Sequence, residues 1–112
     1  MINITHNSAR TERLGIDTRL KQADPGQNAA FEEAIQRGIS TVASRAKGFQ
    51  GAKVNRGIES PERYVLQIFW DTLEDHTVGF RQGPLFAEWR AIVGPFFAVP
   101  PVVEHFTLVA KV

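Results

Sequence analysis

Three side chains in the second half of the sequence have the chemistry to move a proton or to hold an anion. His76 and His105 are imidazoles, which titrate near neutral pH and can serve as a general base or acid. Arg90 brings a permanent positive charge, which stabilises a developing phenolate or peroxide anion best in a dry pocket. Each also has a structural interpretation: His76 as an exposed helix residue, His105 as a hydrogen-bonded strand residue, and Arg90 in an ion pair with Glu88 or Asp71. We predict that His76, Arg90 and His105 are catalytic.

Aromatic side chains lie close to these residues in the sequence, above all in the segment FRQGPLFAEWRAIVGPFF (80–97). Those that we predict to bind a flat small molecule are Trp70, Phe80, Phe86 and Trp89. Trp70 would stack on the ligand and donate its indole N–H. The alternative is a purely structural role in the core, because a fully buried Phe side chain stabilises the fold by about 1.5–3 kcal/mol. We expect an apolar cavity beside the second helix, with Phe80 and Phe86 facing Trp70 across it.

The composition argues against several other kinds of site. The 13 basic and 12 acidic residues nearly cancel, so we expect neither a nucleic-acid partner nor a membrane partner. The sequence has no cysteine, no HxH or HxxxH pair and no glycine-rich nucleotide motif, so we expect no metal and no cofactor. No apolar run is long enough to span a bilayer, and the expected location is the cytoplasm.

These residues must be positioned by a small set of strands and helices. The apolar periodicity predicts strands at residues 13–21, 49–57, 63–71 and 100–112, and helices at 25–46 and 72–93. In the third strand the alternation places Tyr64, Leu66, Ile68 and Trp70 on one face.

Caps and breaks set the predicted ends of the two helices. Asp24 is the expected N-cap of the first helix, and Gly48 its C-terminal residue. Asp71 is the expected cap of the second helix, with Glu74 three residues later. Pro84 follows Gly83 and disfavours helical geometry there, so the second helix should be split at this point. Gly94-Pro95 should end it.

The element order βαββαβ predicts an α+β, ferredoxin-like fold with one antiparallel sheet and both helices on one face. We expect one domain at residues 13–112, preceded by an N-terminal arm at 1–12 that includes His6. The second face of the sheet needs a cover, and no third helix is available to provide it. We therefore expect a homodimer in which two sheets pack together as a dimeric α+β barrel.

Several motifs in order resemble the antibiotic biosynthesis monooxygenase family. DPGQNAAFEEAI resembles the family's Pro-Gly start of helix 1, and KGFQGAKV its second strand. YVLQIFWDTLEDHTVGFRQGPLFAEWRAIVGPF resembles its third strand and second helix, and PPVVEHF its last strand. The resemblance covers roughly residues 13–110. It implies a range of activities: oxygenation of anthrones to quinones with O₂ and no cofactor, oxidation of quinol-like compounds, or haem degradation.

The resemblance also implies roles for individual residues. In the cofactor-free oxygenases, the Trp that ends strand 3 corresponds to Trp70, and the helix-2 Arg to Arg90. Those enzymes have a polar Asn on strand 3, but the corresponding position here is near Leu66, so no side chain can take its role. The aromatic hydroxyl at the start of their helix 2 corresponds to a position near His76. The haem-degrading members have an Asn on strand 1, a Trp in helix 2 and an iron-ligating His near the end of helix 2. The corresponding positions in this sequence are near Asp17, near Phe80, and at Trp89 or Arg90. Since the residue types differ, the resemblance argues against haem degradation.

Two functions from different classes remain open at this stage. The first is a cofactor-independent monooxygenase that acts on an aromatic, quinol-like molecule and O₂, which is the activity that the resemblance favours. The second is a dimeric binding or stress-response module that sequesters an apolar ligand in the same cavity without turnover. The missing strand-3 Asn favours the second function. Haem handling is a weaker third alternative.

Overall fold

The computed structural model describes residues 12–20 and 25–112 of the chain. Its elements are, in order, β1 (Glu12–Arg19), α2 (Pro25–Thr41), η1 (Ala43–Arg45), β2 (Phe49–Arg56), β3 (Arg63–Trp70), η2 (Asp75–Phe80), α3 (Leu85–Val93), η3 (Gly94–Phe96) and β4 (Val102–Thr107). The strands form one antiparallel sheet in the order β2-β3-β1-β4. This arrangement confirms the predicted ferredoxin-like fold. The predicted cap Asp24, His6 and residues 1–11 of the predicted arm lie outside the described residues, whereas Glu12 belongs to β1.

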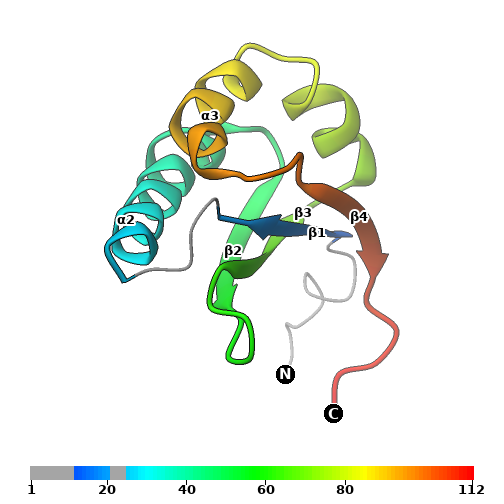
Figure 1. Ribbon diagram of the computed structural model, residues 1–112. Helices are drawn as coiled ribbons and strands as arrows, with labels where there is room; N and C mark the ends of the chain where they lie inside the picture. Colours follow the sequence, from blue (N-terminus) through cyan, green and yellow to red (C-terminus); the bar gives the residue numbers. More distant parts are fainter. Residues whose placement is uncertain (1–11, 21–24) are drawn as a thin grey trace.

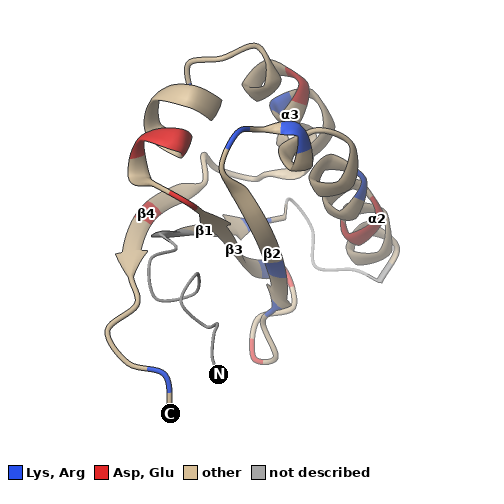
Figure 2. Cartoon of the chain, turned by 180° about the vertical axis from the view of Figure 1, so that it is seen from behind, with Lys and Arg blue, Asp and Glu red and all other residues tan. Residues whose placement is uncertain are grey.

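The helices cover one face of the sheet (Figure 1). The predicted alternation of β3 is confirmed, because Tyr64, Leu66, Ile68 and Trp70 are all about 1% exposed under the helices. Ile16 of β1 pairs with Leu66 and faces the same way, and Phe31 and Ile35 of α2 complete this core. No helix of the described part of the chain is both long and apolar enough to cross a membrane. Both acidic and basic residues occur on α2 and on α3 (Figure 2).

The first helix is shorter than predicted. It ends at Thr41, and a 3-10 turn, η1, follows in place of the expected continuation to residue 46. The Ser40 hydroxyl donates to the carbonyl of Gln36, and the Thr41 hydroxyl to that of Arg37. Such hydroxyl groups compete for the carbonyls that continue a helix, and they bend it. Gly48, the predicted C-terminal residue, instead joins η1 to β2, with φ at +84°.

The start of the second helical region also differs from the prediction. Asp71 does not cap it: the Thr72 hydroxyl oxygen accepts a hydrogen bond from the backbone N–H of Asp75, while the Asp71 carboxylate accepts one from Gln50. The following segment, η2, is a π-helix rather than an α-helix, and the N–H of Arg81 reaches back to the carbonyl of His76. Single π turns of this kind are frequent at functional sites.

The Gly-Pro breaks act as predicted. Residues 81–84 form a turn that separates η2 from α3, and Gly94 begins the short turn η3 that ends α3. The chain then crosses below α3 and is tied to the end of β1, where the Ala98 N–H donates to the Arg19 carbonyl. The last strand covers residues 102–107, so the prediction that it continues to residue 112 is wrong.

Candidate functional site

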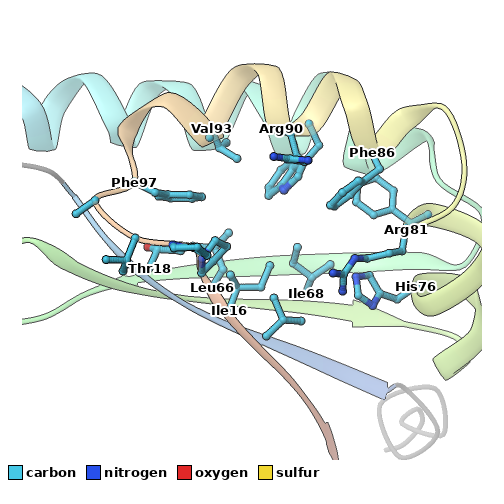
Figure 3. A pocket seen from close by; sticks show the side chains of 18 residues that line it. Ile16, Thr18, Leu66, Ile68, His76, Arg81, Phe86, Arg90, Val93 and Phe97 are labelled. Carbon is cyan, nitrogen blue, oxygen red and sulfur yellow. The ribbon is translucent and has the colours of Figure 1, made fainter.

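A cavity of about 470 Å³ lies between the sheet and α3. Its floor is apolar and comes from β1, β3 and β4, while its roof comes from η2, α3 and the crossing segment 94–101 (Figure 3). The polar groups of its lining side chains are those of His76, Arg81 and Arg90, the indole N–H of Trp89, and the hydroxyl of Thr18. That hydroxyl already donates to the Tyr64 carbonyl at 3.3 Å. The acid–base and cationic groups of the cavity are therefore one imidazole and two guanidinium groups.

The π turn of η2 points His76 into the interior rather than to the surface. His76 is 3% exposed, so the interpretation of this residue as an exposed helix residue is wrong. Its Nδ1 lies 2.9 Å from Nε2 of His105, a hydrogen bond in which one ring donates and the other accepts. Nε2 of His76 makes no hydrogen bond to a described residue, and His76 lines the cavity. This nitrogen is therefore the one that can meet a ligand.

The surroundings of His76 keep its ring neutral. Burial is the largest cause that lowers its pKa, followed by the charges of His105 and Arg81, and together they lower the pKa from 6.5 to about 4. A neutral imidazole can accept a proton from a ligand, which a protonated ring cannot do.

His105 reaches His76 from the edge strand β4. It pairs with Leu14 of β1 in the same register that pairs Val103 with Ile16, so His105 and Val103 share the face under the helices. His105 is exposed and is not part of the cavity wall. Its contact with the site is made through His76, whose ring centroid lies 5.1 Å away.

Two arginines face the cavity near the same aromatic ring. The guanidinium carbon of Arg81 lies 5.5 Å from the centroid of Phe86, and that of Arg90 lies 5.9 Å from it. Arg90 does not form the ion pair considered from the sequence, because Glu88 pairs with Arg45. Arg81 was not predicted as a site residue: in the sequence it is one more charged residue beside a turn, and only the split between η2 and α3 turns it toward the cavity.

The predicted aromatic residues divide between the wall and the core. Phe80, Phe86 and Trp89 line the cavity. Trp70 is absent from the wall and lies behind it, with its ring centroid 5.6 Å from those of His76 and Phe80. The expectation that Phe80 faces Trp70 across the cavity is therefore wrong, because the two rings pack directly on each other. The indole N–H of Trp70 is buried without a hydrogen-bond partner in the described residues.

The described residues contain no cluster of three or more His, Cys, Asp or Glu side chains that could hold a metal ion. The polar side chains of the cavity wall are instead suited to an organic ligand. Guanidinium groups bind oxygen anions, and the aromatic and aliphatic side chains bury a flat apolar body.

Comparison with known proteins identifies relatives over most of the chain. The family model for antibiotic biosynthesis monooxygenase matches residues 15–92. The uncharacterized protein YczJ of Bacillus subtilis (strain 168) is 36% identical over 81 residues, which cover 72% of this chain and 84% of that protein.

Solved structures extend this relationship. A proposed antibiotic biosynthesis monooxygenase of Bordetella bronchiseptica superimposes with a TM-score of 0.81 at 36% identity, over 89% of this chain and 98% of that chain. The ActVA-Orf6 monooxygenase of Streptomyces coelicolor, solved with Nanaomycin D, has a TM-score of 0.78 over 99% of this chain and 97% of that chain. Its 16% identity is evidence of a common fold alone. With the family model matched over more than half of its length, the chain belongs to the antibiotic biosynthesis monooxygenase family.

Proposed function

We propose that this protein is a cofactor-independent monooxygenase that oxidises an aromatic, quinol-like small molecule with O₂. The observation that carries the proposal is the buried, neutral imidazole of His76, which lines an apolar cavity and is hydrogen-bonded to His105. Membership of the family supports a monooxygenase activity in general. The other candidate substrate-binding residues are Phe80, Phe86 and Trp89 on the wall. Trp70 lies behind the wall and packs against His76 and Phe80, so it supports the site without lining it.

The reaction begins with removal of a proton from an electron-rich phenol or anthrone. The resulting anion passes one electron to O₂, and the two radicals combine to a peroxide. For an anthrone, loss of water then leaves a new carbonyl group. One oxygen atom ends in that carbonyl, and the other leaves as water with the two hydrogens of the methylene group. The protein has to supply a base, a cation beside the anion, and an apolar cage.

The pair of imidazoles can act as the base in two linked transfers. Nε2 of His76 takes the substrate proton while its Nδ1–H passes to Nε2 of His105, 2.9 Å away. A lone His76 with a pKa of about 4 would be a weak base. With His105, the positive charge moves out of the buried ring beside Arg81 to an exposed ring, from which solvent can take the proton. His76 is then the group that touches the substrate, and His105 acts through it.

Arg90 offsets the negative charge that forms on the substrate. Its guanidinium lies against Phe86 on the cavity wall, and it forms no ion pair with a described carboxylate. Arg90 is exposed, so its charge stabilises the anion most when the bound ligand displaces water from around the guanidinium group.

An oxygen-consumption assay tests this proposal directly. A panel of hydroxyanthrones and naphthohydroquinones should consume O₂ with the purified protein in the presence of a metal chelator. For the anthrones, label from ¹⁸O₂ should appear in the new carbonyl group of the product. We expect His76→Gln to lower the rate about 100-fold or more, and Arg90→Gln by about 100-fold. The matched control is Arg45→Gln, an exposed arginine outside the cavity wall, which should leave the rate unchanged.

The proposal fails if no member of the panel is oxidised faster than in buffer, or if His76→Gln and Arg90→Gln match the wild type. The alternative of a binding module that sequesters its ligand is favoured by the burial of His76, which lowers the pKa of this ring and makes it a poor base by itself. Tight binding of the same compounds without any O₂ consumption would establish that alternative.

We also propose that the protein is a homodimer. The sheet face opposite the helices is covered by no element of the described chain, and it presents Phe106 and Val102 of β4, which are 51% and 59% exposed. Val65 and Phe69 of β3 point to the same side. A second copy packed sheet to sheet would remove this apolar surface from water.

A further inference from the structure

The cavity carries more positive charge than the proposed reaction needs. Arg81 and Arg90 both line it, and no aspartate or glutamate is among its lining residues. His76 adds no further positive charge, because its pKa of about 4 leaves the ring neutral at pH 7. One positive charge is enough to offset one transient phenolate, so the two arginines together can also hold one permanent anion of the ligand.

The two arginines also differ from four other arginines in the described part of the chain. Arg19, Arg37, Arg45 and Arg56 each form an ion pair with a glutamate. Arg81 and Arg90 form none with a described carboxylate, although Glu88 lies only two residues from Arg90. Four arginines outside the cavity wall are thus paired, whereas no described carboxylate pairs with the two at the cavity.

Both arginines border the same part of the cavity. Both guanidinium groups lie beside the ring of Phe86, at 5.5 and 5.9 Å from its centroid, one from the turn after η2 and one from the middle of α3. Figure 3 shows Arg81 next to His76 and Arg90 projecting from α3 toward the cavity. Guanidinium groups bind carboxylates with two parallel hydrogen bonds, and the adjoining apolar wall receives the ring that carries the carboxylate.

We propose that Arg81 and Arg90 bind a permanent carboxylate of the ligand, so that the cavity selects aromatic carboxylic acids over neutral aromatic compounds of the same shape. The inference deepens the proposed function and rests on it only for the statement that such a compound is a substrate. In that case the substrate is a hydroxylated polycyclic aromatic acid: its carboxylate is anchored at the Phe86 end, and a phenol or anthrone group is presented to His76.

Binding measurements without O₂ test this inference separately from catalysis. The probes are 2-naphthoate and 2-naphthamide, which have the same ring system and nearly the same shape but differ in charge. Titration calorimetry of the full-length protein should give an affinity at least about 10-fold higher for naphthoate. This difference should shrink as salt is raised from about 0.01 M to about 0.15 M.

Variants of Arg81 and Arg90 show whether these two side chains cause the difference in affinity between naphthoate and naphthamide. We expect Arg81→Gln and Arg90→Gln each to weaken naphthoate binding about 10-fold and to change naphthamide binding less than about twofold. Arg81→Lys, which keeps the charge without the planar fork, should recover part of the loss. The matched control Arg45→Gln should bind both probes as the wild type does. Both arginines are exposed, so the folded state should tolerate these substitutions, and a thermal melt checks this.

Several results would overturn the carboxylate site. They are no measurable naphthoate binding to the wild type, equal affinity for the two probes, and an Arg81→Gln variant that weakens both probes equally. These outcomes are distinct from failure of the oxygenase proposal. Charge-selective binding without any turnover would leave the carboxylate site in place and remove the oxygenase, whereas turnover of neutral quinols without charge selection would do the reverse.

Discussion

His76 shows what one residue's sequence context can and cannot indicate. Its type suggested acid–base chemistry, and its place after a strand suggested the start of a helix. Its burial and its 2.9 Å contact with His105 depend on the register of β4 against β1 and on the π turn of η2. The two imidazoles are 29 residues apart in the chain, and no local pattern encodes their contact. Arg81 was missed for the same reason.

The low pKa of His76 predicts a dependence of stability on pH. Its folded-state pKa of about 4 lies below the ordinary value of 6.5, so the unfolded chain binds more protons between these two values. The free energy of unfolding should therefore rise from pH 4 to pH 6.5, by up to about 3 kcal/mol from this residue, and fall as the pH is lowered through the same window. Urea titrations at intervals across this window measure the change.

Two variants show whether His76 causes this pH dependence of the free energy of unfolding. His76→Gln should flatten the pH profile between 4 and 6.5. His105→Gln should retain most of the slope, because burial rather than the neighbouring imidazole is the largest cause of the lowered pKa. Parallel profiles for the wild type and His76→Gln would show that another group controls this window.

At the scale of helices and strands, the sequence patterns predicted those features that depend only on neighbouring residues. The alternation of β3 and the glycine–proline breaks around α3 were confirmed, since period and backbone restriction are properties of the residues themselves. The end of α2, the cap at Thr72 and the π geometry of η2 were not predicted. They depend on which of several competing hydrogen bonds the packed chain keeps, and these competitors have similar strength.

The junction before β2 gives a prediction at this scale. Gly48 has φ at +84°, and a side chain there would collide with the carboxylate of Asp75, the first residue of η2. Gly48→Ala should therefore lower the free energy of unfolding by about 1–2 kcal/mol or more, from the left-handed backbone and from displacement of Asp75. Denaturant unfolding measures this loss directly.

Gly94 provides the matched control. Its φ of −57° and ψ of −40° are ordinary helical values, and apart from its chain neighbours a Cβ atom added there meets nothing within 4 Å. Gly94→Ala should therefore cost less than Gly48→Ala, and its cost should come only from Pro95, which disfavours helical geometry at the residue before it. If the two alanine variants were equally stable, the positive φ and the close approach of Asp75 at Gly48 would not matter energetically.

At the scale of the whole molecule, the described residues 12–20 and 25–112 leave one sheet face without a cover. The helices, the cavity and His76 all lie on the opposite face, so a second copy could cover the bare face without obstructing the site. The ring of Phe106 lies close over Gly15 on the bare face, where an added Cβ would come within 2.6 Å of its Cε1 atom. The glycine thus makes room for a large apolar side chain that is still half exposed in the single chain.

Sedimentation equilibrium at micromolar concentration tests the dimer, and we expect about twice the chain mass of 12.5 kDa. Phe106→Asp should shift the mass toward 12.5 kDa, because it places a charge on the face that would be buried. Val78→Asp is the matched control: Val78 is 53% exposed, close to the 51% of Phe106, but lies on η2 at the helical side. It should leave the mass unchanged. A wild-type mass near 12.5 kDa would contradict the dimer, and dissociation by both variants alike would place the interface elsewhere.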